Sequence, residues 1–446
     1  MNNSDDNIES RITPFRGIRY NQNKVKDLDK VICPPYDVIT PQQQEEYYNK
    51  SKHNIIRLEY TARHNEDAIT GKIYERAANT FQQWMADEVL FRDVDAAFYL
   101  HDYYFDYQGV KRKRRELIAR VKLEPWYKNI CPHENTFPEA KSDRLSLMRA
   151  CQVSFSSILV LYDDTGDKLA TILSRATESK PIIELSGSNE QHIVWAITEG
   201  KLVSRISELL TPKPLFIADG HHRYETALTY QSERLNSLSS NGQGEDMPVS
   251  SSRDAFNYIM MNLVDFSDPG LLMSSIHRLV RGIEPPVLDV VRQRLENFFT
   301  VESVPIIEMT LGSLKQNMPD DVSMAVLGLE SQSITLLKER QDGSIKNVMP
   351  KNHTIAYSNL GTNLFNYVVL DKVLGIAKES DDISYVADVD EAYQKIKEGA
   401  YQLAFLLTAP KTEIIKDISF ARERVPYKST YFHPKLPTGL IMNPLF

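Results

Sequence analysis

Apolar residues recur along this chain at two spacings, and each spacing predicts a different kind of element. Between residues 67 and 86 they recur every three or four positions, which is the period of one helix face. A second helix is predicted after Thr40, because Thr40-Pro41-Gln42-Gln43 has the sequence of a capping box with proline at the first helical position. The apolar positions of the helix predicted between residues 67 and 86 are Ile69, Ile73, Ala77, Phe81 and Trp84.

Other segments have the composition of strands. Residues 96–107 and 110–123 are rich in aromatic and aliphatic side chains and flank Gln108-Gly109, which predicts a β-hairpin. Residues 156–164, "SSILVLYDD", have the length and β-branched content of a buried strand. Residues 383–409 predict strand, helix and strand in that order. The chain as a whole is therefore expected to be mixed α/β.

Length and turn signals predict two domains. At 446 residues the chain is too long for one ordinary core. Residues 236–254 are rich in Ser, Gly and Asn and predict an exposed, flexible loop, and "SDPGLL" at 267–272 is a turn signal. We expect an N-terminal domain over 1–266, and a smaller α/β domain over 267–446 whose tail packs near the functional site.

Composition narrows the protein class. The chain is 42% hydrophobic and 25% charged, as in globular proteins. It has no apolar run of the roughly 18 residues that a membrane helix needs, and no secretion signal, so we expect a cytoplasmic protein without a membrane partner. A formal charge of −8 argues against nucleic acid as the partner. Locally, the basic run 111–115 predicts a solvated sheet edge. Cys33, Cys131 and Cys151 lack CxxC spacing, which predicts reduced structural thiols.

The richest cluster of polar groups is "IADGHHRYETAL", residues 217–228, where a predicted strand meets a predicted helix. Asp219 is the expected helix N-cap, and Gly220 permits a tight turn. The amides of a helix start attract anions, and His221, His222 and Arg223 add imidazoles and a planar guanidinium. This combination suits nucleotide phosphates. The alternative is ordinary capping with a structural histidine pair.

A second cluster, "CPHENTFPEAKSDRLSLM" at 131–148, brings His133 and Glu134 before a helix that Lys141 and Arg144 open. A carboxylate beside an imidazole suits a general base or a metal ligand, and the two cations suit phosphate. The alternative is a solvated helix start. A second His at HExxH spacing is missing, so a zinc-protease site is excluded.

Two further segments carry weaker signals. "VICPPYDVIT", residues 31–40, presents Tyr36 and Asp37 at a proline-bounded turn, where turn capping is an equal alternative. The tail 427–442 sets Lys435 among aromatics and prolines, either as a flap over a site or as a docked C-terminus. The sequence lacks GxxxxGK[ST], a strand-linked GxGxxG and GxSxG, which excludes P-loop, Rossmann and common serine-hydrolase sites.

Four of these segments, in this order, resemble the domain-of-unknown-function family numbered 1015, and the resemblance runs from Pro14 to the C-terminus. The core "DGHHR" also resembles the shorter GxHR signature of the ParB/sulfiredoxin superfamily, which implies a catalytic region of that fold. The four motifs are "VICPPYDVI", "HENTFPEAKSDRL", "ADGHHRYETAL" and "YKSTYFHPKLPTGL".

The superfamily resemblance implies nucleotide chemistry. Its members include free-serine kinases, sulfiredoxins and CTP-binding partition proteins, in which this loop holds nucleotide phosphates at a helix start. Sulfiredoxin has a catalytic Cys where this chain has His221, and the DNA-reading helical domain of partition proteins is not evident. The best expectation is an ATP- or ADP-dependent kinase with Mg²⁺, acting on a small hydroxyl compound, with free L-serine as the first candidate.

In the kinase hypothesis the turn around Gly220 and His221 holds the phosphates, and Arg223 braces the transferred group. His222 donates to the developing charge, and Asp219 either assists Mg²⁺ or positions an imidazole. The sequence does not identify the metal ligands themselves.

The remaining candidates supply a base and the substrate contacts. Glu134 is the expected base, and Glu59 in "IIRLEY" is its rival. His133, Lys141 and Arg144 would hold nucleotide or a substrate carboxylate, whereas Tyr36, Asp37, Glu59 and Lys435 are candidate substrate contacts. The alternative function is a non-catalytic regulator that binds CTP or ATP.

Overall fold

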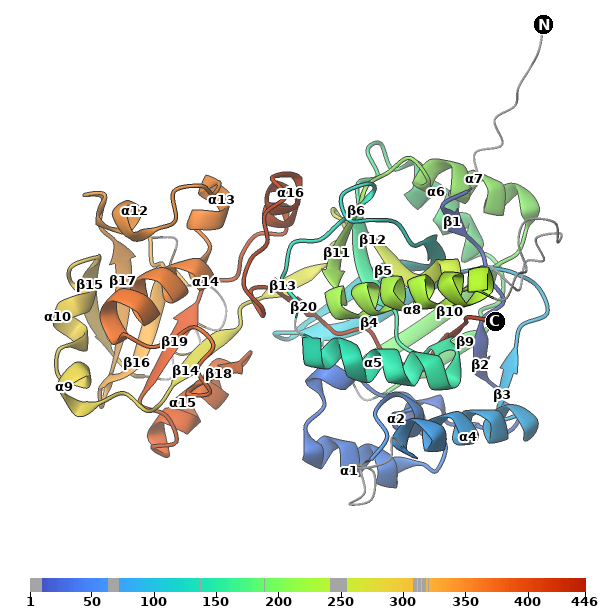
Figure 1. Ribbon diagram of the computed structural model, residues 1–446, viewed down its shortest axis with the longest axis horizontal. Coiled ribbons are helices and arrows are strands. Elements are labelled where there is room, and N and C mark those ends of the chain that lie inside the picture. Colours follow the sequence, from blue (N-terminus) through green and yellow to red (C-terminus); the bar gives the residue numbers. More distant parts are fainter. Residues whose placement is uncertain are drawn as a thin grey trace, which may run out of the picture. The chain divides into compact units, whose positions relative to one another are not determined.

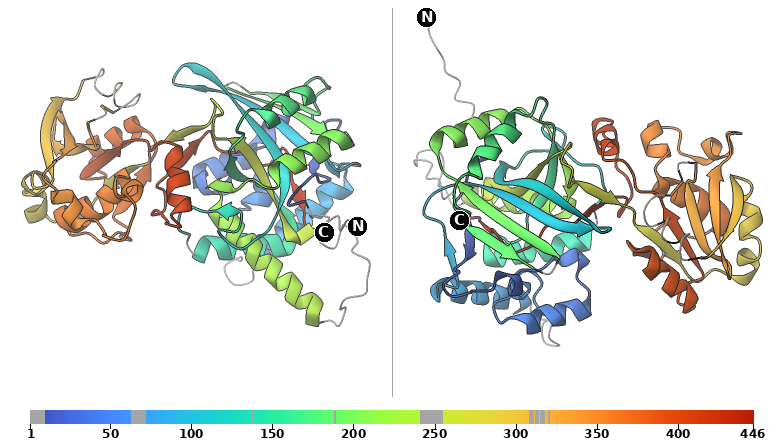
Figure 2. Two further views of the ribbon diagram at one scale, coloured as in Figure 1. Left: turned by 90° about the horizontal axis from the view of Figure 1, so that it is seen from above. Right: turned by 180° about the vertical axis from the view of Figure 1, so that it is seen from behind.

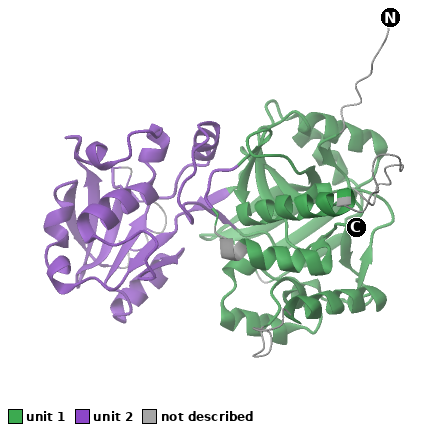
Figure 3. Cartoon of the chain, viewed as in Figure 1, with its two compact units in different colours: residues 1–131, 136–271, 434–446 green, residues 132–135, 272–433 purple. Residues whose placement is uncertain are grey.

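The computed structural model describes residues 10–62, 72–136, 138–187, 189–240, 255–307, 311, 314, 318, 319 and 321–446. The chain divides into two compact units (Figure 3). Unit 1 comprises residues 1–131, 136–271 and 434–446, and unit 2 comprises residues 132–135 and 272–433. Both units combine helices with sheets (Figure 1), so the mixed α/β class is confirmed.

Unit 1 is built on a nine-stranded sheet in the order β6-β11-β8-β12-β5-β4-β10-β9, with β1 beside β5. The predicted hairpin is confirmed as β4 and β5, seen in cyan in Figure 2. Gln108 and Gly109 both have positive φ at its turn, which suits the twist of a two-residue hairpin. The strand predicted within 156–164 is confirmed as β8, and all five of its residues are buried. The strands of the sheet are β1 (Ile12–Thr13), β4 (Phe98–Tyr107), β5 (Val110–Lys122), β6 (Ile130–Cys131), β8 (Ile158–Tyr162), β9 (Ile183–Ser186), β10 (Glu190–Ile197), β11 (Leu215–Asp219) and β12 (Tyr258–Asp265).

Apolar cores cover both faces of this sheet. Side chains alternate along a strand, so Tyr99 and Ile118 lie in one core while Leu100 and Leu117 lie in the other. The first core also takes the apolar faces of α2 and α4, and the second takes those of α6, α7 and α8. The helical segments are η1 (Leu28–Lys30), η2 (Tyr36–Val38), α1 (Pro41–Lys50), α2 (Ile56–Glu59), α4 (Lys72–Ala86), α5 (Pro138–Cys151), α6 (Lys168–Ala176), α7 (Gly200–Leu210), α8 (His221–Ser240) and η3 (Ala255–Asn257).

The helices predicted from the sequence are present. In α1, the Thr40 hydroxyl accepts from the Gln43 amide and the Gln43 side chain accepts from Thr40, so the capping box is confirmed. In α4, Ala77, Phe81 and Trp84 are buried as predicted. Asp67 and Ile69, the predicted start of that helix, lie outside the described residues. Among the described residues, no helix is both long enough and apolar enough to cross a membrane.

The C-terminal tail returns to unit 1. There β21 (Asn443–Pro444) pairs with β7 (Val153–Ser154), and Thr438 pairs with Cys33. Ile441 and Met442 are buried in the first core, beside the small sheet of β2 (Ile18–Tyr20) and β3 (Leu90–Arg92). Unit 1 therefore contains residues on both sides of segment 272–433, and residues 132–135 belong to unit 2.

Unit 2 contains a six-stranded antiparallel sheet in the order β15-β17-β16-β19-β14-β18, and β13 pairs with β20 beside it. The predicted strand, helix and strand over 383–409 are confirmed as β18, α15 and β19. Its strands are β13 (Leu272–Ser274), β14 (His277–Val280), β15 (Phe299–Pro305), β16 (Met324–Glu330), β17 (Ser333–Glu339), β18 (Ile383–Val386), β19 (Leu403–Leu407) and β20 (Tyr431–His433). Its helices are α9 (Pro285–Leu288), α10 (Val291–Leu295), α12 (Ser344–Val348), α13 (Ile355–Ser358), α14 (Gly361–Leu364), the π-helix η4 (Phe365–Leu374), α15 (Val389–Lys397) and α16 (Glu413–Phe420).

Two segments differ from expectation. The basic run 111–115 is not simply a solvated edge, because Arg114 is 0% exposed and Arg115 pairs with Asp102. Alternation along β5 directs these two guanidinium groups to opposite faces of the sheet, where each meets a buried carboxylate. In the predicted loop 236–254, residues 236–240 form the end of α8, and residues 241–254 lie outside the described residues.

Candidate active site

The corner between β11 and α8 is formed by Asp219, Gly220 and His221. Asp219 is the last residue of β11 and His221 the first of α8, so Gly220 occupies the N-cap position. The prediction that Asp219 caps the helix is therefore wrong. Gly220 has φ +100, a backbone conformation that side chains with a Cβ rarely adopt. The first amides of α8 have no acceptor within the helix, which makes this turn a natural anion site.

The Asp219 carboxylate faces two cations instead of the helix amides. Arg223 Nη2 contacts one oxygen at 2.5 Å, and Lys435 Nζ contacts the other at 2.5 Å. Burial alone would raise the pKa of this carboxyl, but Lys435 and Arg223 outweigh it and hold the pKa well below its usual range. Asp219 is therefore ionised, and the three side chains together carry a net positive charge.

Arg223 is directed inward. Its side chain is 7% exposed, and its Nη1 donates to the Ser157 carbonyl. A Cβ at Gly220 would lie 3.0 Å from Arg223 Nε, so glycine also allows the guanidinium to lie against the turn. The geometry shows Arg223 shaping the corner, and its direct contact with a phosphate stays a prediction.

The first turns of α5 and α8 lie side by side (Figures 1 and 2). Lys141 Nζ contacts Glu225 Oε2 at 2.9 Å, and Thr136 Oγ1 donates to the same oxygen at 2.6 Å. Burial lowers the pKa of the His222 imidazole below 6.5, although the charges of Asp37 and Glu225 act in the opposite direction. His222 is therefore neutral at pH 7, beside Lys141 and the start of α8.

The turn η2 and the helix α2 bring Tyr36 and Glu59 to the same part of unit 1. The Arg144 guanidinium lies 4.0 Å from the Tyr36 ring centroid, and its Nη1 donates to the Glu59 carbonyl at 2.7 Å. Glu59 Oε1 accepts from Ser156 Oγ at 2.8 Å. Burial raises the pKa of the Glu59 carboxyl above 4.5, against the opposing effects of Arg144 and Ser156. Arg144 therefore acts here as an internal link between two elements.

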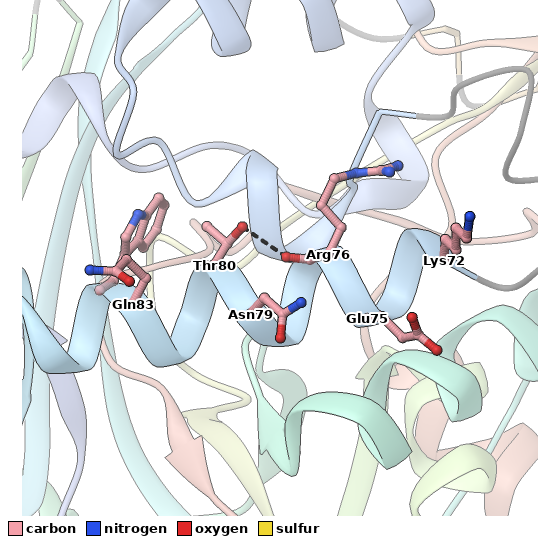
Figure 4. A pocket seen from close by; sticks show the side chains of 7 residues that line it. Lys72, Glu75, Arg76, Asn79, Thr80 and Gln83 are labelled. Atoms are coloured by element: carbon pink, nitrogen blue, oxygen red, sulfur yellow. Dashed lines mark hydrogen bonds between the residues drawn. The ribbon is translucent and has the colours of Figure 1, made fainter.

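One hollow of unit 1 lies beside this cluster, and another follows α4. A pocket of about 20 Å³, the size of one water molecule, is lined by Glu59, Asp143 and Arg144. A larger open groove of about 500 Å³ follows one face of α4 between Lys72 and Trp84. Figure 4 shows the residues that line the groove, with the Thr80 hydroxyl donating a hydrogen bond to the Arg76 carbonyl. The side chains that line this groove carry charges of both signs. None of the corner residues is among them.

His133 and Glu134 belong to unit 2. His133 is buried, with its Nε2 2.9 Å from Thr430 Oγ1. Glu134 pairs with Val425 in an isolated β-bridge, and its Oε1 accepts from the Lys428 amide at 3.3 Å. Glu134 as the base of the reaction stays a prediction.

Unit 1 thus brings together most residues predicted from the sequence. Sequence reasoning missed Glu225, Ser156 and Ser157, which partner Lys141, Glu59 and Arg223 respectively. Glu225 follows Arg223 by two positions in the motif "IADGHHRYETAL". Its place in the first turns of the predicted helix could therefore have marked it as a candidate site residue. The serines carried no such signal, because they precede a strand that was recognised only by its apolar run. In unit 1 the structure places Tyr36, Asp37, Glu59, Lys141, Arg144, Asp219, Gly220, His221, His222, Arg223 and Lys435.

Metal ligands are not grouped in the described part of the chain, where no three His, Cys, Asp or Glu side chains gather as a metal site. The three cysteines are free and buried, as expected.

Comparison with known proteins identifies a family. The family model described as "Protein of unknown function (DUF1015)" matches residues 12–362. None of the curated proteins matches the chain.

Several solved structures show a distant likeness. A conserved hypothetical protein from Pyrococcus furiosus is 13% identical with a TM-score of 0.32, covering 72% of this chain and 93% of that one. Free serine kinase in complex with AMP is 11% identical with a TM-score of 0.32, covering 72% and 92%. SbnI with a C-terminal truncation, from Staphylococcus aureus, is 10% identical with a TM-score of 0.36, covering 74% and 87%. These values are too low to support an argument about function.

Proposed function

The chain belongs to the DUF1015 family, and from that premise we propose that it is a small-molecule kinase. In this proposal the corner in unit 1 binds the phosphates of ATP or ADP. The terminal phosphoryl group passes to the hydroxyl of a small acceptor, with L-serine as the first candidate and O-phosphoserine as its product. The resemblance of the corner sequence to free-serine kinases supports the choice of acceptor.

The observation that carries the proposal is the charge arrangement at the corner. The 20-residue helix α8 begins there, and its amide end carries about half a positive charge. Asp219 is matched by both Arg223 and Lys435, which leaves one excess positive charge beside those amides. Phosphoryl transfer depends mainly on positioning and charge neutralisation, which such a corner supplies.

Two side chains near the corner would act on the phosphates. Neutral His222 would donate a hydrogen bond to the oxygen on which charge develops, and Lys141 would add a second cation from the start of α5. Magnesium is held in kinases by one or two carboxylates and the phosphates, and it neutralises phosphate charge when bound. Asp37, an exposed carboxylate whose charge acts on both His222 and Arg223, fits that role.

The base has two candidates. Glu134 lies in unit 2 and Glu59 in unit 1, where burial has already raised the pKa of Glu59 toward the range of a working base. Loss of the true base lowers kcat by about 10²- to 10⁴-fold and removes the acidic limb of the pH profile of kcat. Comparison of Glu134→Gln with Glu59→Gln by these two readouts identifies it.

The decisive experiment is turnover. The protein is incubated with L-serine, Mg²⁺ and ATP or ADP, and mass spectrometry follows O-phosphoserine. His222→Gln is expected to lower kcat about a hundredfold, corresponding to about 3 kcal/mol. His53→Gln is the matched control, since His53 is also partly buried in unit 1 but packs against Trp84. Failure of every small hydroxyl compound to give a phosphoester with either nucleotide contradicts the kinase.

One observation favours a second candidate, a nucleotide-binding regulator without catalysis. The carboxylates Asp219, Glu225 and Glu59 all make ion pairs within unit 1. A corner of this kind holds phosphates without supplying a base. Saturable binding of CTP or ATP, with no product from any acceptor, supports the regulator over the kinase.

A further inference from the structure

A cluster of ionisable side chains is buried on one face of the unit 1 sheet, and none of them is among the residues assigned to phosphate binding. Arg114 and Glu116 of β5 are both 0% exposed, and Arg114 Nε donates to Glu116 Oε1 at 2.6 Å. His101 of β4 lies opposite Glu116, with its Nδ1 3.0 Å from Glu116 Oε2. His101 Nε2 is in turn 3.0 Å from His192 Nδ1. We call these four residues the buried cluster.

The cluster is charged despite its burial. Burial acts to raise the pKa of Glu116, but Arg114, His101 and the Asn262 amide together lower it to about 2. Glu116 is therefore a carboxylate at pH 7, paired with the Arg114 guanidinium. Buried ion pairs are weak sources of stability compared with apolar packing, and in some proteins they serve to specify one arrangement of the chain.

The buried cluster contacts the C-terminal tail at the point where the tail returns to unit 1. Arg114 Nη1 donates to the Pro434 carbonyl at 3.0 Å. Pro434 is the residue at which the chain re-enters unit 1, and the next residue is Lys435, which binds Asp219 at the corner. The Pro434 carbonyl and the Lys435 amide share one planar peptide unit, so fixing that carbonyl also fixes the backbone of Lys435.

We propose that Arg114, held by Glu116, which His101 contacts in turn, is a positioning residue that sets the tail in register so that Lys435 meets Asp219. Lysine has a long, flexible side chain, and an ammonium placed accurately on one carboxylate needs its backbone fixed. This proposal deepens the proposed function, because it makes the position of Lys435 at the cationic corner depend on Arg114 in β5. Only the nucleotide-binding part of the test rests on the proposed function.

The test measures the chemical accessibility of Lys435. The full-length protein is labelled with trace acetic anhydride, and the rate at Lys435 is compared by mass spectrometry with that at exposed Lys52. In the wild type, Lys435 is largely buried and reacts slowly. Arg114→Met is expected to raise the relative rate about tenfold, because the amine loses the opposite charge that protects it. Arg114→Lys, which keeps the charge without the guanidinium fork, is expected to restore part of the protection.

The matched control is Arg115→Met. Arg115 is the next residue of β5 and also pairs with a buried carboxylate, Asp102, but on the opposite face of the sheet. Its loss removes a comparable ion pair and should leave the Lys435 rate unchanged. Equal labelling of Lys435 in folded Arg114→Met and wild type overturns the proposal, as does equal acceleration in both methionine variants. If Arg114→Met does not fold, as judged by circular dichroism, Glu116→Gln takes its place with the same expectation.

Nucleotide binding separates this proposal from the proposed function. If the wild type binds ADP, Arg114→Met should weaken its affinity about tenfold while Arg115→Met does not. If the wild type binds neither ADP nor ATP, the proposed function fails, and the labelling of Lys435 still decides whether Arg114 positions the tail.

Discussion

Asp219 is approached by two cations from separate parts of the chain, Arg223 from the helix that follows it and Lys435 from the C-terminal tail. All three side chains are at most 15% exposed. A carboxylate in this position balances charge, since its removal leaves two buried cations without their partner. Its contribution to stability is therefore expected to exceed that of a helix cap.

We expect Asp219→Ala to lower the free energy of unfolding by about 3–5 kcal/mol, which is the cost of breaking a buried ion pair. Equilibrium denaturation in urea measures the change. Glu233→Ala removes from α8 the exposed ion-pair partner of Arg149 in α5 and should cost less than about 1 kcal/mol. A loss of only about 1 kcal/mol for Asp219→Ala would contradict the charge-balancing role of this carboxylate.

Acid sensitivity follows from the same physics. The pKa of Asp219 and that of Glu116 lie below their ordinary values of 3.8 and 4.5, because neighbouring cations outweigh burial. Each carboxyl then binds fewer protons when folded than when unfolded. Its contribution to stability is complete above its ordinary pKa and is lost as the pH falls. We expect the free energy of unfolding to decrease from about pH 4.5 downward.

Urea denaturation at a series of pH values checks this expectation. Glu116→Gln should reduce the slope of stability against pH between about pH 4.5 and pH 2, because one of the titrating groups is gone. An unchanged slope in that variant would show that Glu116 does not titrate in the native protein with a lowered pKa.

At the scale of elements, the start of α8 depends on the backbone of Gly220. Its φ of +100 turns the chain from β11 into the helix, and Arg223 Nε lies only 3.0 Å from where a Cβ would be. The positive φ and the absence of a Cβ are both properties of Gly220. A substitution at this residue is therefore expected to disturb the turn and the orientation of Arg223 together.

We expect Gly220→Ala to destabilise the protein by about 1–3 kcal/mol, from backbone strain and displacement of Arg223. Thermal and urea denaturation measure the loss. Gly109→Ala is the control, because Gly109 also has positive φ but a Cβ there has nothing within 4 Å. The loss at Gly220 should exceed that at Gly109, and equal losses would mean that the contact with Arg223 is unimportant.

The strand β5 shows how one element serves two purposes. Arg114 and Glu116 belong to the buried cluster, while Arg115 between them pairs with Asp102 on the other face. The alternation of side chains along a strand predicts that Arg114 and Arg115 point to opposite faces of the sheet. It does not predict that each guanidinium meets a buried carboxylate.

At the scale of the whole molecule, the chain leaves unit 1 for the long segment 272–433 and then returns to it. The returning tail supplies Lys435 to the corner and Leu440, Ile441 and Met442 to the first core. Unit 1 is therefore completed by residues far from the rest of its sequence.

Removal of residues 434–446 is expected to prevent stable folding of unit 1. Each large apolar side chain lost from the core costs about 1.5–3 kcal/mol, and total stabilities are only about 5–15 kcal/mol. Hydrogen exchange resolved on β4 and β5 measures the loss of protection. Phe446→Ala, at an exposed terminal residue, should change stability by less than about 0.5 kcal/mol. Native protection of β4 and β5 in the shortened chain would contradict the role given to the tail.

The sequence alone determined the features that depend on neighbouring residues. The capping box at Thr40, the turn at Gln108-Gly109 and the strand β8 follow from local spacing and side-chain type, and the structure confirms them. The strand-to-helix corner around Gly220 was predictable for the same reason.

Only the tertiary structure decided which charges meet. Asp219 was predicted to cap a helix because a sequence displays its near neighbours, and its partner Lys435 lies 216 positions away. Likewise, Arg114 and Glu116 are two positions apart on β5, but the contact of Arg114 with the Pro434 carbonyl joins residues 320 positions apart. Short-range periodicity fixes secondary structure, whereas the burial and pairing of charges depend on where distant segments of the chain return.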